Sequence, residues 1–202
     1  MRPIRDYIRA FEYLFNYLLL EKPRGLDFSM RDLSEIKDGQ QHGYAMTSDK
    51  AVKHLANLVD FKDKSFLDIG SGKGRVPYKA YKLGAKTAEG VEFSQKLHKI
   101  ALNNYEILRV SNVCKSNCVD ATQFDRYSQF NIFFLFNPFE DDLYEAVIDR
   151  LMEQCMSDDI QRTIICYGGA NLKAVAKYDY VSLLFEGICP HRNNRIVIYT
   201  FN

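Results

Sequence analysis

The chain has 202 residues, of which 47% are hydrophobic, and it carries 27 Lys and Arg against 26 Asp and Glu. This length fits one domain with at most a short appendage, and the hydrophobic fraction is high enough for a core, which excludes a disordered chain. A formal net charge of +1 gives no global field that would recruit nucleic acid or an anionic membrane. A dedicated nucleic-acid binder is therefore disfavoured.

The N-terminal residues 4–18 place apolar side chains at helical spacing, which predicts an amphipathic helix. Asp6, Arg9 and Glu12 interrupt its apolar stretch, and the uncharged run 13–20 is too short to span a membrane. We therefore expect neither a signal segment nor a membrane span. The helix could pack on its own domain, on a partner or on a membrane surface.

Pro23 ends that helix, and a polar, mostly irregular stretch follows it. We expect residues 1–47 to form an N-terminal helix and cap segment over one edge of the domain. Ser48 or Asp49 can cap the next helix, so the main domain is expected to cover residues 48–202.

Apolar runs of strand length then alternate with helical patterns, which predicts parallel strands joined by helices. The expected strands are 65–70, 87–93, 112–118, 131–136 and 163–168, and the expected helices are 75–83, 94–109 and 141–156. The last two strands, 181–188 and 195–201, leave no room for a crossover helix and must be antiparallel neighbours. The predicted fold is α/β: a doubly wound, seven-stranded, mostly parallel sheet with an antiparallel C-terminal strand and an N-terminal helical cap.

A glycine-rich turn, DIGSGKG at 68–74, joins the first strand to a helix and allows a ligand to approach the backbone closely. It is not a phosphate-binding P-loop, because Leu67 stands where the first glycine is needed and Gly74 follows Lys73. It fits the dinucleotide pattern only weakly, because Arg75 replaces the last glycine. Lys73 and Arg75 themselves are expected to be solvated cations at the helix start.

Polar residues also follow the next three strands: Glu92, Asp120 and Asn137. All would lie at the carboxyl edge of the sheet, where such folds bind ligands. A carboxylate at Glu92 can accept hydrogen bonds from both hydroxyls of a ribose, and Asp120 can reach an adenine amino group. The set predicts an adenosine-containing ligand.

These motifs resemble the class I S-adenosylmethionine-dependent methyltransferases over roughly residues 48–202. The resemblance implies S-adenosylmethionine as the cofactor, with Asp68 and the glycine loop at its methionine moiety, Glu92 at the ribose and Asp120 at the adenine. The implied cofactor-binding residues are Asp68, Gly70, Ser71, Gly72, Gly74, Glu92, Phe93, Asp120 and Ala121.

Tyr44 with Thr47, the GKGR of 72–75 and the FNPF of 136–139 are similar to a group of small bacterial methyltransferases with unassigned targets. The turn at 137–139 also resembles the (Asp/Asn)-Pro-Pro-(Tyr/Phe) loop of amino methyltransferases, although the second proline is missing. The expected catalytic residues, which would position the methyl acceptor, are Asn137, Pro138, Phe139 and Tyr44. His42 lies beside Tyr44 and could approach the substrate, or it could have no special role.

The implied activity is methyl transfer to an unidentified acceptor, with a nitrogen of a protein side chain or of a small molecule as the first expectation. The alternatives are an RNA methyltransferase, a non-catalytic S-adenosylmethionine-binding subunit and an NAD-dependent dehydrogenase. Five scattered cysteines without metal-ligand spacing indicate a reducing, cytoplasmic setting and no metal site. The oligomeric state is not predicted.

Overall fold

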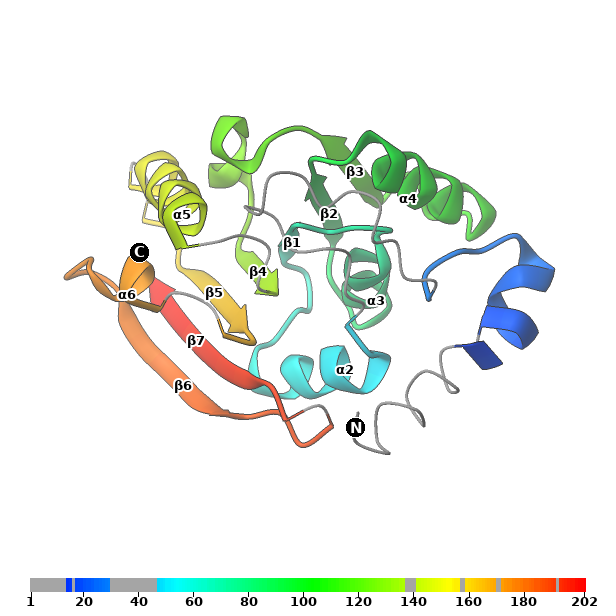
Figure 1. Ribbon diagram of the computed structural model, residues 1–202. Coiled ribbons are helices and arrows are strands. Elements are labelled where there is room, and N and C mark those ends of the chain that lie inside the picture. Colours follow the sequence, from blue (N-terminus) through cyan, green and yellow to red (C-terminus); the bar gives the residue numbers. More distant parts are fainter. Residues whose placement is uncertain are drawn as a thin grey trace.

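The computed structural model describes residues 14–15, 17–29, 47–136, 141–156, 159–169, 172–191 and 193–202. Its centre is one seven-stranded sheet in the order β3-β2-β1-β4-β5-β7-β6 (Figure 1). The strands are β1 (Ser65–Ile69), β2 (Thr87–Glu92), β3 (Cys114–Cys118), β4 (Ile132–Phe136), β5 (Arg162–Tyr167), β6 (Ser182–Ile188) and β7 (Arg195–Phe201). Strands β1 to β5 pair in parallel, and β7 runs antiparallel to both β5 and β6. The predicted doubly wound α/β fold is confirmed.

Helices cover both faces of the sheet and create a three-layer molecule (Figure 1). The helices are α2 (Asp49–Leu58), α3 (Arg75–Lys82), α4 (Gln95–Ile107), α5 (Asp141–Cys155) and α6 (Leu172–Ala176). Buried side chains of α2, α3 and α4 pack on one face, and those of α5 and α6 pack on the other. Each face therefore has its own hydrophobic core.

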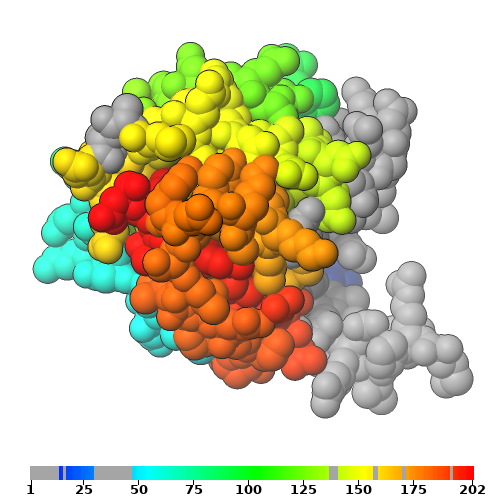
Figure 2. Space-filling model, turned by 90° about the vertical axis from the view of Figure 1, so that its left-hand side faces the viewer, coloured from blue at the N-terminus to red at the C-terminus, as the bar shows by residue number. Residues whose placement is uncertain are grey.

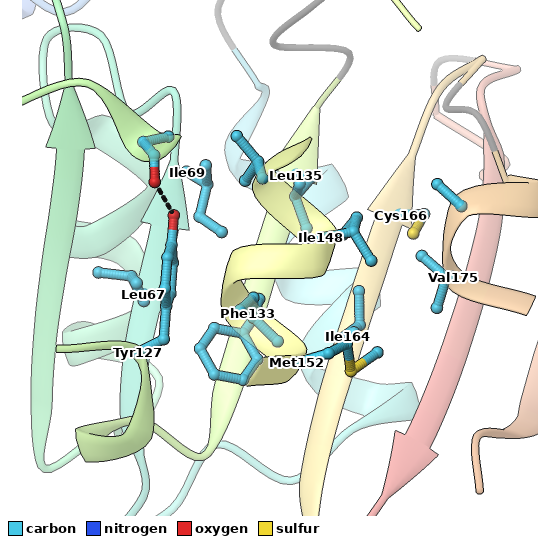
Figure 3. Packing of buried hydrophobic residues seen from close by; sticks show 14 of the residues in the cluster. Leu67, Ile69, Tyr127, Phe133, Leu135, Ile148, Met152, Ile164, Cys166 and Val175 are labelled. Carbon is cyan, nitrogen blue, oxygen red and sulfur yellow. Dashed lines mark hydrogen bonds between the residues drawn. The ribbon is translucent and has the colours of Figure 1, made fainter. Parts of the chain in front are cut away.

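Strand β4 shows why its sequence is apolar at every position. Ile132 and Phe134 face the core beneath α2 and α3, whereas Phe133 and Leu135 face the core beneath α5. All four are at most 2% exposed. Figure 3 shows the α5 side, where Phe133 and Leu135 lie among side chains from neighbouring strands and from α5. A strand buried on both faces has no polar side.

Serine hydroxyls cap two of the helices that frame the carboxyl edge of the sheet. Ser48 Oγ accepts a hydrogen bond from Ala51 N at the start of α2, and Ser94 Oγ accepts one from Leu97 N at the start of α4, both at 3.3 Å. These bonds satisfy amides that a helix leaves unpaired in its first turn. They also fix where both helices begin.

Two regions differ from the sequence-based expectation. Residues 121–130 contain two short 3₁₀ turns, Ala121–Gln123 and Tyr127–Gln129, and α6 is a five-residue helix that the apolar pattern did not indicate. Most of the helix expected over 4–18 lies outside the described residues. Within the described part, Tyr17–Glu21 forms a single π-helical turn.

Exposed apolar side chains gather at two places in the described residues, apart from scattered ones such as Phe93 and Met156. One is the N-terminal segment, where Leu14, Phe15, Leu18, Leu19 and Leu20 are 45–56% exposed. The other is the edge strand β6 with Leu183, Leu184 and Ile188, and Figure 2 faces this end of the molecule, with α6, β6 and β7 in orange and red. None of the helices in the described residues is long and apolar enough to cross a membrane.

Candidate cofactor site

The glycine loop follows β1 at the carboxyl edge of the sheet and turns sharply into α3. Gly70, Gly72 and Gly74 have φ values of 81°, 55° and 79°, a region that residues with a side chain rarely adopt. The alternation of glycines in the sequence is thus explained by backbone conformation. Gly74 has a second constraint, because an added Cβ would overlap the hydroxyl of Tyr105 on α4.

The amides of this loop donate to acceptors within the protein. Gly70 N and Ser71 N bond the carbonyl of Val91 at 2.9 and 3.0 Å, and Gly74 N bonds the carbonyl of Ser71 at 3.0 Å. Gly72 N donates to Glu92 Oε2 at 2.7 Å. A site for a pyrophosphate presents such amides to the ligand. Here four of them are already used.

Glu92, the last residue of β2, lies where the sequence places a ribose-binding acid. Its Oε2 accepts from Gly72 N and its Oε1 accepts from Ser94 N at 2.8 Å, so the carboxylate bridges the glycine loop and the start of α4. These bonds to two backbone amides fix its orientation at the sheet edge. The side chain is 9% exposed.

Asp68, in β1, is a second carboxyl group buried beside Glu92. It is 3% exposed, and no hydrogen bond from the described residues reaches its side chain. Burial, together with the nearby charge of Glu92, raises the pKa of Asp68 well above its ordinary value. A cationic ligand group at this edge would reverse both effects, because it would stabilise the ionised carboxylates.

Phe93, Asp120 and Ala121, the residues expected at the adenine, follow the ends of β2 and β3, and Ala121 is buried at 4% exposed. The Phe93 ring is 48% exposed and directly follows Glu92. Asp120 caps the turn Ala121–Gln123: its Oδ1 accepts from Thr122 N at 2.8 Å and from Thr122 Oγ1 at 2.7 Å. In the described residues no hydrogen bond occupies Asp120 Oδ2. Asp120 therefore starts a turn and still has an oxygen that can meet a ligand.

Ser71 was expected among the cofactor-binding residues, but its side chain points back onto β2. The Oγ atom is buried without a hydrogen-bond partner and lies so close to Gly90 that a Cβ there would overlap it. Only the backbone of Ser71 can therefore serve the cofactor site. The contact also explains why β2 has a glycine in its middle.

The expectation that Lys73 and Arg75 are solvated cations is wrong. Lys73 is 2% exposed, and its ammonium forms an ion pair of 2.7 Å with Asp27. Arg75 pairs with Asp49 at 2.7 Å and with Glu21 at 3.2 Å. The partners lie 26 to 54 residues away in the sequence, which is why local sequence patterns gave no sign of them.

The other expected site residues lie outside the described residues. These are the four expected catalytic residues, Tyr44, Asn137, Pro138 and Phe139, and also His42. Phe136, the last residue of β4, brings the chain to the carboxyl edge directly before Asn137, and its ring meets that of Tyr167 with a centroid separation of 5.0 Å. The residues expected to position the acceptor thus follow directly after β4, the strand that pairs with β5.

Residues 36–174, about two thirds of the chain, match the family model described as Conserved hypothetical protein 95. The chain belongs to this family. Ribosomal protein L11 methyltransferase of Macrococcus caseolyticus is 31% identical over 77 residues, which are 38% of this chain. The matched part spans only 22% of that curated relative.

Solved structures share the fold over most of the chain at low sequence identity. An RNA methyltransferase from Salinibacter ruber in complex with S-adenosyl-L-homocysteine has a TM-score of 0.64 and 17% identity, covering 78% of this chain and 94% of that one. Magnesium protoporphyrin IX methyltransferase from Synechocystis with bound S-adenosylmethionine has a TM-score of 0.61 and 18% identity, covering 76% and 79%. The class I methyltransferase fold is confirmed, and the expected enzyme class and cofactor are those of the matched proteins.

Proposed function

We propose that this protein transfers a methyl group from S-adenosylmethionine to a nitrogen of a protein side chain or of a small molecule. One observation supports the cofactor assignment. In the glycine loop, the Gly72 amide donates a hydrogen bond to Glu92, and a second carboxyl group, that of Asp68, is buried near Glu92. This arrangement favours a cationic ligand over an anionic one. The fold supplies the matching architecture.

The charge of the site separates the two cofactors that could use such a loop. A nicotinamide dinucleotide carries a negatively charged pyrophosphate. The backbone amides of Gly70, Ser71 and Gly72 already donate within the protein and are not available to it, and the pyrophosphate would also face two acids. S-adenosylmethionine carries a sulfonium and an ammonium group, which two carboxylates attract. The NAD-dependent dehydrogenase alternative is therefore disfavoured.

The residue roles follow the resemblance and the positions in the structure. Asp68 and the backbone of 70–74 would hold the methionine moiety, and Glu92 the ribose. Phe93, Asp120 and Ala121 would hold the adenine. The exposed Phe93 ring offers an apolar surface to a base, and the second carboxylate oxygen of Asp120 offers an acceptor to an adenine amino group.

When bound, S-adenosylmethionine supplies the methyl group. Its leaving group is a neutral thioether, so no acid is needed at the sulfur. The protein has to align the acceptor with the methyl carbon and keep water out. We assign acceptor positioning to Asn137, Pro138, Phe139 and Tyr44, as the resemblance implies. A protonated amine must also lose a proton, to a base or along a water path.

A protein nitrogen is the first candidate to test, because a relative that matches over 22% of its own length is a ribosomal protein L11 methyltransferase. RNA is the second candidate, because one of the similar structures is an RNA methyltransferase. A protein methyltransferase and an RNA methyltransferase can be distinguished by which macromolecule receives the methyl group. A third outcome, cofactor binding without any transfer, would indicate a non-catalytic subunit.

The test is transfer of radiolabelled methyl from S-adenosylmethionine to fractions of a bacterial lysate: total protein, total RNA and small molecules. Label that protease releases, or label in the small-molecule fraction, supports the proposal, whereas label that ribonuclease releases assigns RNA. The variant Glu92→Ala serves as the control and should abolish the signal. Cofactor binding without label in any fraction would contradict an enzymatic role.

A further inference from the structure

A short N-terminal segment, residues 21–29, is held in a closed turn that we call the strap. The carboxylate of Glu21 accepts hydrogen bonds from Phe28 N at 2.9 Å, from Ser29 N at 2.8 Å and from Ser29 Oγ at 2.5 Å. Glu21, Leu26, Phe28 and Ser29 are all at most 7% exposed. Figure 1 shows the strap in blue beside α3 and α4, far along the chain from both.

The strap contacts the back of the glycine loop through a buried ion pair. Lys73 stands between Gly72 and Gly74, and its ammonium meets Asp27 Oδ2 at 2.7 Å. The Lys73 side chain is 3% exposed and that of Asp27 33%. A buried ammonium is costly unless it is paired, so this contact ties the middle of the loop to the strap.

Asn104 of α4 connects the same two segments and is fully buried. Its Oδ1 accepts from Asp27 N at 2.9 Å, and its Nδ2 donates to Asp27 O at 3.0 Å and to Lys73 O at 3.1 Å. Beside it, the Tyr105 hydroxyl donates to Gly74 O at 3.0 Å. The loop is therefore held by its carbonyls on the α4 side and by the Gly72 amide on the Glu92 side.

We infer that Asp27, Lys73 and Asn104 are positioning residues that preset the glycine loop for the cofactor, so that strap docking and cofactor binding are coupled. The inference rests on the proposed function, because it concerns the affinity of the same site. Asp27 belongs to the strap and not to the expected cofactor site. Its effect would act through the backbone of Lys73 and the two flanking glycines.

The physical reason lies in the ion pair. In Asp27→Asn, the carboxylate that meets the ammonium of Lys73 is lost, so the tie between the strap and the backbone of 72–74 weakens and the loop shifts. In the double variant Asp27→Asn with Lys73→Met, the buried ammonium is removed as well, so nothing draws the loop away from its position. Loss by the single variant and recovery by the double variant is the signature of this coupling.

Calorimetric titration of the full-length protein with S-adenosylhomocysteine measures the effect. Asp27→Asn should weaken binding by roughly tenfold, within the range typical of coupled sites, and the double variant should bind within about threefold of the natural chain. The control is Glu89→Gln, which removes a more deeply buried acid from β2, with a side chain 8% exposed against 33% for Asp27, and breaks its ion pairs with Arg126 and Lys115, none of which is in the loop. It should bind normally.

Hydrogen exchange supplies a readout that a merely structural role would not change. By reciprocity, saturating S-adenosylhomocysteine should slow exchange of the amides of Asp27, Phe28 and Ser29, which lie on the strap. Asp27→Asn should speed exchange in the loop at 70–74 while leaving β4 and β5 protected.

Two outcomes separate this inference from the proposed function. If the natural chain does not bind S-adenosylhomocysteine at all, the proposed function fails. If the natural chain binds it, but Asp27→Asn binds equally well and the strap amides do not respond, the inference is overturned while the function stands.

Discussion

Glu92 is the residue on which the candidate site most depends. Its carboxylate accepts the amide of Gly72 and the amide of Ser94, so it organises the loop after β1 and the start of α4 at once. Asp120 has a more local part, because its bonds go to Thr122 in its own turn. The two acids should therefore contribute unequally to cofactor affinity.

We expect Glu92→Ala to weaken S-adenosylhomocysteine binding by at least about tenfold, and Asp120→Ala to weaken it less. The reason is that Glu92 holds the loop and, in the role proposed for it, would also accept bonds from the ribose, and hydrogen bonds to a charged group contribute about 1.5–3 kcal/mol each. Calorimetric dissociation constants of the two variants decide the order. Equal and negligible losses would mean that the ribose lies elsewhere.

Asp68 predicts a dependence of cofactor binding on pH. Its pKa is raised in the folded protein by burial and by Glu92, so the ligand-free fold binds this proton more tightly than the unfolded chain does. The free energy of unfolding contributed by Asp68 therefore falls as pH rises from about 4 through the raised pKa. A bound cation favours the ionised form, so S-adenosylmethionine affinity should rise over the same window.

Titrations in two buffers of different ionisation enthalpy measure the proton released when S-adenosylmethionine binds. Release should fall off above the raised pKa, and Asp68→Asn should remove its pH dependence. Affinity that is independent of pH in the natural chain would place the cofactor's cationic groups away from Asp68.

At the level of elements, the turn after β1 and the middle of β2 are packed against one another. Ser71 lies directly over Gly90, and the amides of Gly70 and Ser71 bond the carbonyl of Val91 in the next position of β2. The shape of the loop is thus set by the strand beside it. A side chain at position 90 would have to displace the loop.

Gly90→Ala should lower the free energy of unfolding by about 1–3 kcal/mol, as overpacking of a tight interior does, and should weaken cofactor binding as well. The double variant Ser71→Gly with Gly90→Ala removes the overlapping side chain and should regain part of both losses. Thermal unfolding and calorimetry provide the two measurements. Normal binding by the single variant would show that the loop adapts without cost.

The parts that the sequence predicted are those governed by short-range patterns. Strands such as β4 are apolar at every position because both faces are buried, and Ser48, one of the two predicted caps, is a residue type that begins helices. Lys73 was assigned to solvent because its partner, Asp27, lies 46 residues earlier. The helix α6 escaped notice because five residues carry too little periodicity.

For the molecule as a whole, the topology brings the ends of β1, β2 and β3 to one edge, with Asp68, Glu92 and Asp120 close to that edge. The strap, which belongs to the N-terminal segment, contacts the glycine loop at this edge on the side where α3 and α4 lie. The N-terminal segment should therefore matter for cofactor binding.

The account rests on one claim, that this edge binds S-adenosylmethionine, and calorimetric titration of the purified full-length chain tests it most directly. We predict one-to-one binding of S-adenosylmethionine and S-adenosylhomocysteine, no binding of NAD, and a fold stabilised by about 2.7 kcal/mol when the ligand is at 100 times its dissociation constant. Binding of NAD together with no response to either S-adenosyl compound would contradict the account.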